Sequence, residues 1–105
     1  MVKIIGAGPI GCFTAHLLAG KGYKVDIYEE HETIGKPVQC TGIITASIKE
    51  IVNTDSIINK IEKIRIHSPN KNYIDVKLKN PDLIIDREKF DKELANKAKK
   101  SGAKI

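Results

Sequence analysis

The sequence predicts an α/β fold built on a parallel sheet, and three features of its 105 residues support this prediction. A short apolar strand at residues 2–5 runs directly into a turn that contains three glycines. A helix over residues 9–19 and a second strand over residues 23–28 follow the turn. A later helix, expected from Arg87 to about Ser101, leads toward another strand at the end of the chain. Alternating strands and helices of this kind are typical of doubly wound nucleotide-binding folds.

The glycine turn has the pattern of a dinucleotide-binding site. Gly6 permits a tight turn, Gly8 lets the backbone approach a pyrophosphate, and Gly11 lets the helix pack closely on the sheet. Free N–H groups and the positive end of the helix dipole would then face the phosphates. Glu29 follows the second strand, about twenty residues further on, where an acid accepts hydrogen bonds from a ribose hydroxyl. An ordinary strand–helix–strand unit is the alternative interpretation.

The first strand is expected to be central and buried, with the first helix packed against the sheet. Four apolar side chains at helical spacing should form the buried face of this helix: Ile10, Phe13, Leu17 and Leu18. Cys12 is expected to be a small buried hydrophobe. His16 lies off the apolar stripe and is expected at the surface.

The connection after Glu29 is long and poor in secondary structure, a feature that is common in functional loops. A helix is expected from Thr45 or Ser47, because Ser47 and Glu50 have the spacing of a capping box. Its apolar side would consist of three residues: Ile48, Ile51 and Val52.

Alternation with a period of two then predicts a β-hairpin, with strands at residues 61–66 and 74–78. Asn80-Pro81 should break the chain before a short strand at residues 83–85. An antiparallel hairpin between units of a parallel fold indicates an excursion into a second, substrate-side sheet. In the helix that follows, the expected buried stripe consists of Phe90, Leu94 and Ala98, and Gly102 is its expected stop.

Composition and charge limit the class of protein. With 41% hydrophobic and 30% charged residues, the chain should fold as a globular protein. The formal charge of +5 does not predict a nucleic-acid partner, because lysines are scattered and many lie a helical turn from an acid, as Lys92 does from Glu88. Cys12 and Cys40 lack metal-ligand spacing, which favours a reducing cytosol and predicts no metal site. No paired carboxylates or nucleophile–base set identifies a catalytic residue.

Three stretches together resemble a known family. They are the N-terminal unit that ends in Glu29, the loop Ile-Gly-Lys-Pro-Val-Gln-Cys-Thr-Gly at residues 34–42, and the Asp-Arg-x-x-Phe-Asp helix opening at residues 86–91. In order and spacing they are similar to the geranylgeranyl reductases, within the flavoproteins related to p-hydroxybenzoate hydroxylase. The resemblance implies the N-terminal part of a Rossmann-like FAD-binding fold of the p-hydroxybenzoate hydroxylase/glutathione reductase type, with a β-hairpin excursion.

The resemblance also implies FAD as the cofactor and a set of residues that bind it. These are Gly6, Gly8, Ile10, Gly11, Glu29, Cys40, Thr41, Gly42 and Arg87. Cys40, Thr41 and Gly42 match a loop that approaches the flavin, although several family members carry an extra residue between the cysteine and the glycine. Arg87 matches an FAD-contacting arginine, and its place in the first turn of a helix favours an anionic partner. Two alternatives stay open: Cys40 as a buried thiol, and Lys36 as either a surface lysine or a phosphate neighbour.

The implied activity is reduction of isoprenoid double bonds, on digeranylgeranyl glycerophospholipids in archaeal members. Expected partners are the isoprenoid lipid, an electron donor such as ferredoxin or NAD(P)H, and the remainder of the FAD and substrate domains. The expected location is the cytoplasm, with peripheral contact at the membrane surface.

The expected organisation has three parts. Residues 1–60 form an FAD-binding βαβ unit with the Cys40 loop, residues 61–85 start a substrate-side sheet, and residues 86–105 form a return helix of the FAD domain. The chain is interpreted as an N-terminal fragment. Two other functions remain open: an NAD-dependent dehydrogenase domain, which does not require the Cys40 loop, and a non-catalytic nucleotide-binding module of a split protein.

Overall fold

The computed structural model describes residues 1–105 and divides them into two compact units. Unit 1 comprises Met1–Gln39 and Arg87–Ile105, and unit 2 comprises Cys40–Asp86. The expected boundary at residue 60 therefore differs from the observed one at residue 39. The reason is that strand β3 (Ile43–Ile44) pairs with β5 (Tyr73–Ile85), which joins residues 40–60 to the hairpin.

Unit 1 contains the predicted parallel strands. β1 (Val2–Ile5) pairs with β2 (Val25–Tyr28) in a register that runs from Val2 opposite Val25 to Ile5 opposite Tyr28. On the other side of β2, Lys104 forms a parallel bridge with Asp26, so a third strand begins where the sequence indicated it. β1 was expected to be central and buried, and this is wrong for these residues. It has a partner on one side only, and Ile5 is largely exposed.

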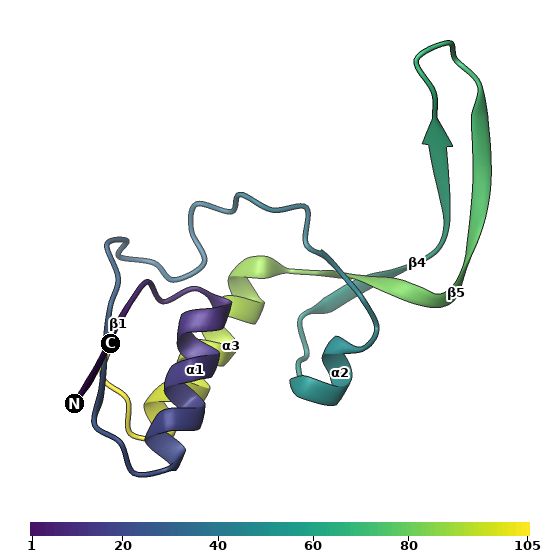
Figure 1. The fold of residues 1–105 in the computed structure, drawn as a ribbon. Coiled ribbons are helices and arrows are strands. Elements are labelled where there is room, and N and C mark those ends of the chain that lie inside the picture. Colours follow the sequence, from purple (N-terminus) through teal and green to yellow (C-terminus); the bar gives the residue numbers. More distant parts are fainter. The chain divides into compact units, whose positions relative to one another are not determined.

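Helices α1 (Pro9–Gly20) and α3 (Arg87–Lys100) lie side by side in unit 1 (Figure 1). The buried residues of α1 are small ones, namely Cys12, Ala15 and Ala19. The expected apolar stripe is wrong, since Ile10 is 80% and Leu17 is 49% exposed. α1 packs mainly on α3 rather than on the sheet, and small side chains at this contact let the two helices approach closely.

The predictions for α3 and for Cys12 are confirmed. The expected stripe of α3 is buried, with Leu94 at its centre, and the chain leaves the helix through Gly102 at a φ of 103°. Cys12 is fully buried, and its thiol donates to the carbonyl of Ala7 at 3.1 Å. Burial raises the pKa of this thiol to about 11, so it stays protonated at neutral pH.

Unit 2 is built on the predicted β-hairpin. β4 (Ile57–His67) and β5 pair antiparallel, and β3 lies on the other side of β5. Pro81 does not end the strand as expected. Ile61 pairs with Asp82 and Lys63 pairs with Lys77, so residues 78–81 of β5 face only one residue of β4. Pro81 therefore lies in a bulge, where its missing N–H costs no ladder hydrogen bond.

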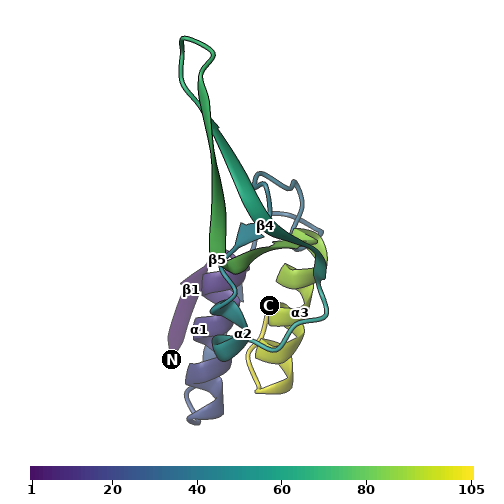
Figure 2. The ribbon, with the colours of Figure 1, turned by 90° about the vertical axis from the view of Figure 1, so that its right-hand side faces the viewer.

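The shape of the hairpin follows from this bulge and from strand twist. Figure 1 shows that the ribbon bends between its tip and its base, and in Figure 2 the two strands cross in projection. Bulges bend a strand and increase its twist, and two-stranded ribbons twist more strongly than large sheets.

The expected helix in unit 2 is shorter than the sequence indicated. α2 spans Ile48–Ile51 only, and the side chain of Ser47 bonds to Thr45 Oγ1 at 2.7 Å instead of capping the helix. The expected apolar side of this helix does not form, because a single turn is too short to present one continuous face. Val52, just after α2, is buried, whereas Ile51 is 61% exposed. None of the helices has the length and apolar character needed to cross a membrane.

Candidate nucleotide-binding site

The glycine turn connects β1 to α1 and leaves the start of the helix open. Gly11 lies so close to the turn that an added Cβ would meet the carbonyl oxygen of Gly6 at 2.2 Å, so glycine is required there. The first helical hydrogen bond runs from Cys12 N–H to the Gly8 carbonyl, which leaves the N–H groups of Ile10 and Gly11 without a helical acceptor. The first turn holds no acidic residue and no capping side chain. Such a helix start favours an anion.

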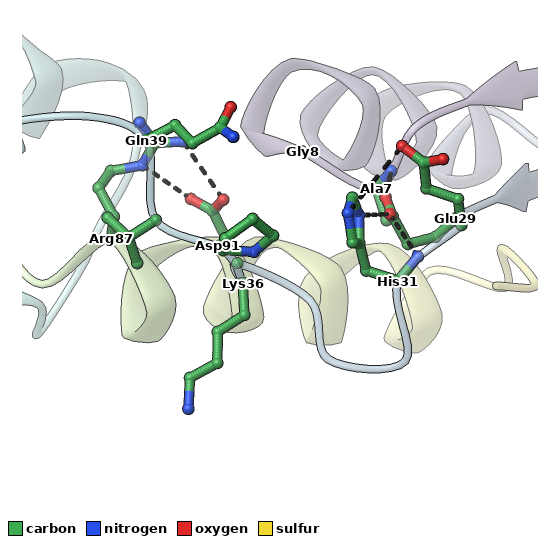
Figure 3. Close-up of a pocket in the computed structure, with 12 residues that line it drawn as sticks. Ala7, Gly8, Glu29, His31, Lys36, Gln39, Arg87 and Asp91 are labelled. Carbon is green, nitrogen blue, oxygen red and sulfur yellow. Dashed lines mark hydrogen bonds and ion pairs between the residues drawn. The ribbon is translucent and has the colours of Figure 1, made fainter.

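Glu29 links the end of β2 to this turn. Its Oε2 accepts a hydrogen bond from the N–H of Ala7 at 2.7 Å, and its Oε1 accepts from the N–H of His31 at 3.0 Å and from His31 Nδ1 at 2.8 Å (Figure 3). The N–H groups of His31 and then Ala7 are the main causes that lower the pKa of Glu29 to about 2. The carboxylate is therefore ionised at neutral pH and fixed beside the turn.

Arg87 begins α3 and is paired with Asp91, one turn further along the same helix. Its Nε and Nη2 donate to the two carboxylate oxygens at 3.0 and 3.3 Å. The Asp91 side chain is only 7% exposed, so this is a largely buried ion pair. The sequence argument that Arg87 needs an anionic partner holds, but in this structure Asp91 supplies the anion.

One cavity of about 310 Å³ brings these groups together within unit 1. Its wall is formed by Ala7 and Gly8 of the turn, residues 29–31, residues 35–39 of the loop, and Arg87 and Asp91 of α3. Lys36 contributes to the wall, but its amine points away from Glu29 and Asp91 (Figure 3) and pairs with Glu88 Oε2 at 3.3 Å. This arrangement favours the interpretation of Lys36 as a surface lysine.

The structure brings together part of the predicted set of FAD-binding residues. Gly8, Glu29 and Arg87 line the cavity, while Gly6 and Gly11 shape the turn. The N–H of Ile10 lies in the first turn of α1 and has no helical acceptor, while the Ile10 side chain is 80% exposed.

The other three predicted residues belong to unit 2. Cys40 is exposed, so the alternative of a buried thiol is wrong, and its Sγ accepts the N–H of Gly42 at 3.3 Å. Thr41 is exposed as well. Gly42 has a φ of 74°, and an added Cβ would meet the carbonyl oxygen of Ile85 at 2.5 Å. Close approach to β5 is therefore enough to require a glycine at this position.

Sequence reasoning did not assign a role to Ala7, His31 or Asp91. Asp91 could have been found, because it lies four residues after Arg87, the spacing at which side chains pair on a helix. His31 gives a weaker signal, since a polar residue two positions after an acid is common in turns. Ala7 acts through its backbone, which its residue type does not reveal.

Comparison with known proteins agrees with this geometry. Residues 4–40 match the family model described as the NAD(P)-binding Rossmann-like domain. A digeranylgeranylglycerophospholipid reductase from Methanocella arvoryzae is 34% identical over 99% of this chain and 28% of its own length. Over nearly its whole length, the chain is similar to the N-terminal part of several digeranylgeranylglycerophospholipid reductases, at 32–34% identity. The resemblance that the sequence motifs indicated is therefore confirmed.

Two further proteins are similar to this chain. An uncharacterized protein from Methanocaldococcus jannaschii is 39% identical over 94% of this chain and 25% of its own length. The crystal structure of a geranylgeranyl bacteriochlorophyll reductase-like protein from Thermoplasma acidophilum has a TM-score of 0.86 at 29% identity, over 99% of this chain and 28% of that protein. The chain thus spans about a quarter of the length of these relatives.

Proposed function

We propose that this chain is the nucleotide-binding portion of an FAD-dependent geranylgeranyl reductase, and that its cavity takes the adenosine diphosphate half of FAD. One observation carries the proposal. The ionised carboxylate of Glu29 is fixed against the glycine turn, in the same cavity as Gly8 and Arg87 and beside the open start of α1. A ribose-binding acid next to an anion-binding helix start suits a nucleoside diphosphate.

The residues fit this group. A Cβ added to Gly8 would meet nothing within 4 Å, so a diphosphate can approach the backbone there. The N–H groups of Ile10 and Gly11 would bind phosphate oxygens, whereas the N–H of Ala7 is already used by Glu29. Glu29 would accept a hydrogen bond from a ribose hydroxyl. Arg87, held by Asp91, adds positive charge to the same cavity.

The proposed substrate is an isoprenoid lipid, as the name of the Methanocella arvoryzae reductase suggests. FAD, once bound and reduced by an electron donor, would supply the hydride for reduction of the alkene, and a proton would complete the saturated bond. The residues of this chain would bind and orient the nucleotide half of the cofactor. Cys40, Thr41 and Gly42 are proposed to approach the flavin. A separate electron donor and peripheral contact with the membrane surface are further parts of the proposal.

A second candidate is an NAD-dependent dehydrogenase domain, because the family model that matches residues 4–40 is described as NAD(P)-binding. FAD and NAD share the adenosine diphosphate half, so the cavity alone fits both. The test is to express the chain within its full-length protein, denature the purified protein, and identify the released nucleotide by chromatography and absorbance. Flavin in the released fraction would support the proposal. Release of NAD without flavin would refute it.

A further inference from the structure

We propose that His31 is a positioning residue of the nucleotide site, which holds the carboxylate of Glu29 against the glycine turn through its ring Nδ1. This inference rests on the proposed function, because it assigns a role within the same cavity. It starts from the contacts of Glu29, since His31 supplies two of the three hydrogen bonds that this carboxylate accepts.

The two bonds from His31 differ in what they depend on. The bond from the backbone N–H to Oε1 persists whatever side chain stands at position 31. The bond from Nδ1 to the same oxygen, at 2.8 Å, exists only with the ring. A carboxylate oxygen accepts about two hydrogen bonds, so both sites of Oε1 are occupied. Oε2 receives one bond, from Ala7, and keeps one site for a ribose hydroxyl.

The ring therefore decides which oxygen faces the ligand. With Oε1 occupied on both sites, the carboxylate cannot rotate without losing a charge-assisted hydrogen bond. Oε2 then stays at the Ala7 N–H and beside the phosphate-binding turn. Without the ring, Oε1 retains a single bond, and the Glu29 side chain, which is 16% exposed, can turn toward water.

The charges around the ring agree with a donor at Nδ1. Glu29 faces Nδ1, and Glu30 Oε1 lies 4.0 Å from Nε2. The other charged groups of the cavity are engaged elsewhere, since Lys36 pairs with Glu88 and Arg87 with Asp91. A carboxylate can only accept, so the Nδ1 atom must carry the proton whether the ring is neutral or charged.

The test compares three variants of the 105-residue chain with the unmodified chain. His31→Ala removes the ring bond, while His31→Asn keeps an N–H donor, because its amide nitrogen is bonded to Cγ just as Nδ1 is in histidine. The control is His67→Ala, which removes an exposed ring from the hairpin of unit 2. ADP affinity is measured by NMR titration, and the pKa of the Glu29 carboxyl by a separate NMR titration without nucleotide.

His31→Ala should weaken ADP binding by about three- to tenfold, the effect of one hydrogen bond at a partly exposed site. It should also raise the pKa of Glu29 above its value of about 2. His31→Asn should restore both properties, and His67→Ala should change neither.

The inference is overturned if His31→Ala leaves either property unchanged, or if His31→Asn behaves like His31→Ala. These outcomes differ from failure of the proposed function, which would show as no ADP binding by the unmodified chain. In that case the carboxyl titration still reports whether His31 holds Glu29. A circular dichroism melt of each variant identifies any variant that fails to fold. If His31→Ala fails to fold, the test is the comparison of His31→Asn with the unmodified chain. An Asn variant with a raised Glu29 pKa or weakened ADP binding would overturn the inference.

Discussion

Replacing Gly11 by alanine should destabilise unit 1 strongly. The added Cβ would lie 2.2 Å from the Gly6 carbonyl oxygen and 3.3 Å from Ile4 Cγ2, where ordinary contacts are at least 3.4 Å. The nearest atom belongs to the backbone of the turn, so relief requires α1 to move away from β1. Overpacking typically destabilises a protein by about 1–3 kcal/mol and occasionally more. Because the nearest atom here belongs to the backbone and cannot rotate away, we expect Gly11→Ala to lower the free energy of unfolding by about 3 kcal/mol. For a chain of this size the melting temperature should then fall by about 12 °C or more.

Gly20→Ala is the matched control, because it makes the same change at the other end of the same helix. A Cβ at Gly20 would meet nothing within 4 Å, so the free energy of unfolding should change by about 1 kcal/mol or less. Both variants are measured by thermal and urea unfolding, followed by circular dichroism. A Gly11→Ala variant that melts within about 3 °C of the unmodified chain would refute the close approach of helix and turn. Equal loss in both variants would refute it as well.

Three other outcomes are expected. Glu29→Gln should weaken FAD binding by about ten- to a hundredfold in a fluorescence titration, because a charged acceptor is lost. Glu62→Gln, at an exposed position on β4 of unit 2, is the control and should leave binding unchanged. Because the pKa of Glu29 is lowered on folding, its contribution to stability is complete above about pH 4.5 and is lost as pH falls toward about 2. Urea unfolding from pH 6 to pH 2.5 should show this loss, and Glu29→Gln should reduce it. The 105 residues tested alone with reduced flavin and a geranylgeranyl lipid should give no saturated product by mass spectrometry, since they span about a quarter of the reductase relatives.

The glycine turn and the position of Glu29 could be predicted because this motif is local in sequence. Its residues follow one another through a strand, a turn, a helix and a second strand, so spacing alone places them. The buried face of α1 could not be predicted in the same way. Helical periodicity shows which side chains share a face, but not what that face meets. Here α1 packs mainly on α3, and the contact selects Ala15 and Cys12 rather than Leu17.

Contacts between distant segments account for most of what the sequence did not reveal. The sequence motif indicates that Gly42 belongs to a cofactor loop. Its close approach to Ile85 arises from the pairing of β3 with β5, about forty residues further along the chain, which the motif does not reveal. The bulge at Pro81 likewise depends on the register between two strands. The contact between Glu29 and Ala7 crosses 22 residues and involves a backbone N–H, which carries no signal in the residue type.

The most direct measurement of the central claim is an NMR titration of the ¹⁵N-labelled chain with FAD. Binding in the cavity should shift the amide signals of Ile10 and Gly11 at the start of α1, Glu29 directly after β2, and Arg87 at the start of α3. The tip of the hairpin, between β4 and β5, should not respond. Unit 1 signals that stay unchanged at millimolar FAD, or shifts confined to the hairpin, would contradict the assignment of this cavity as the nucleotide site.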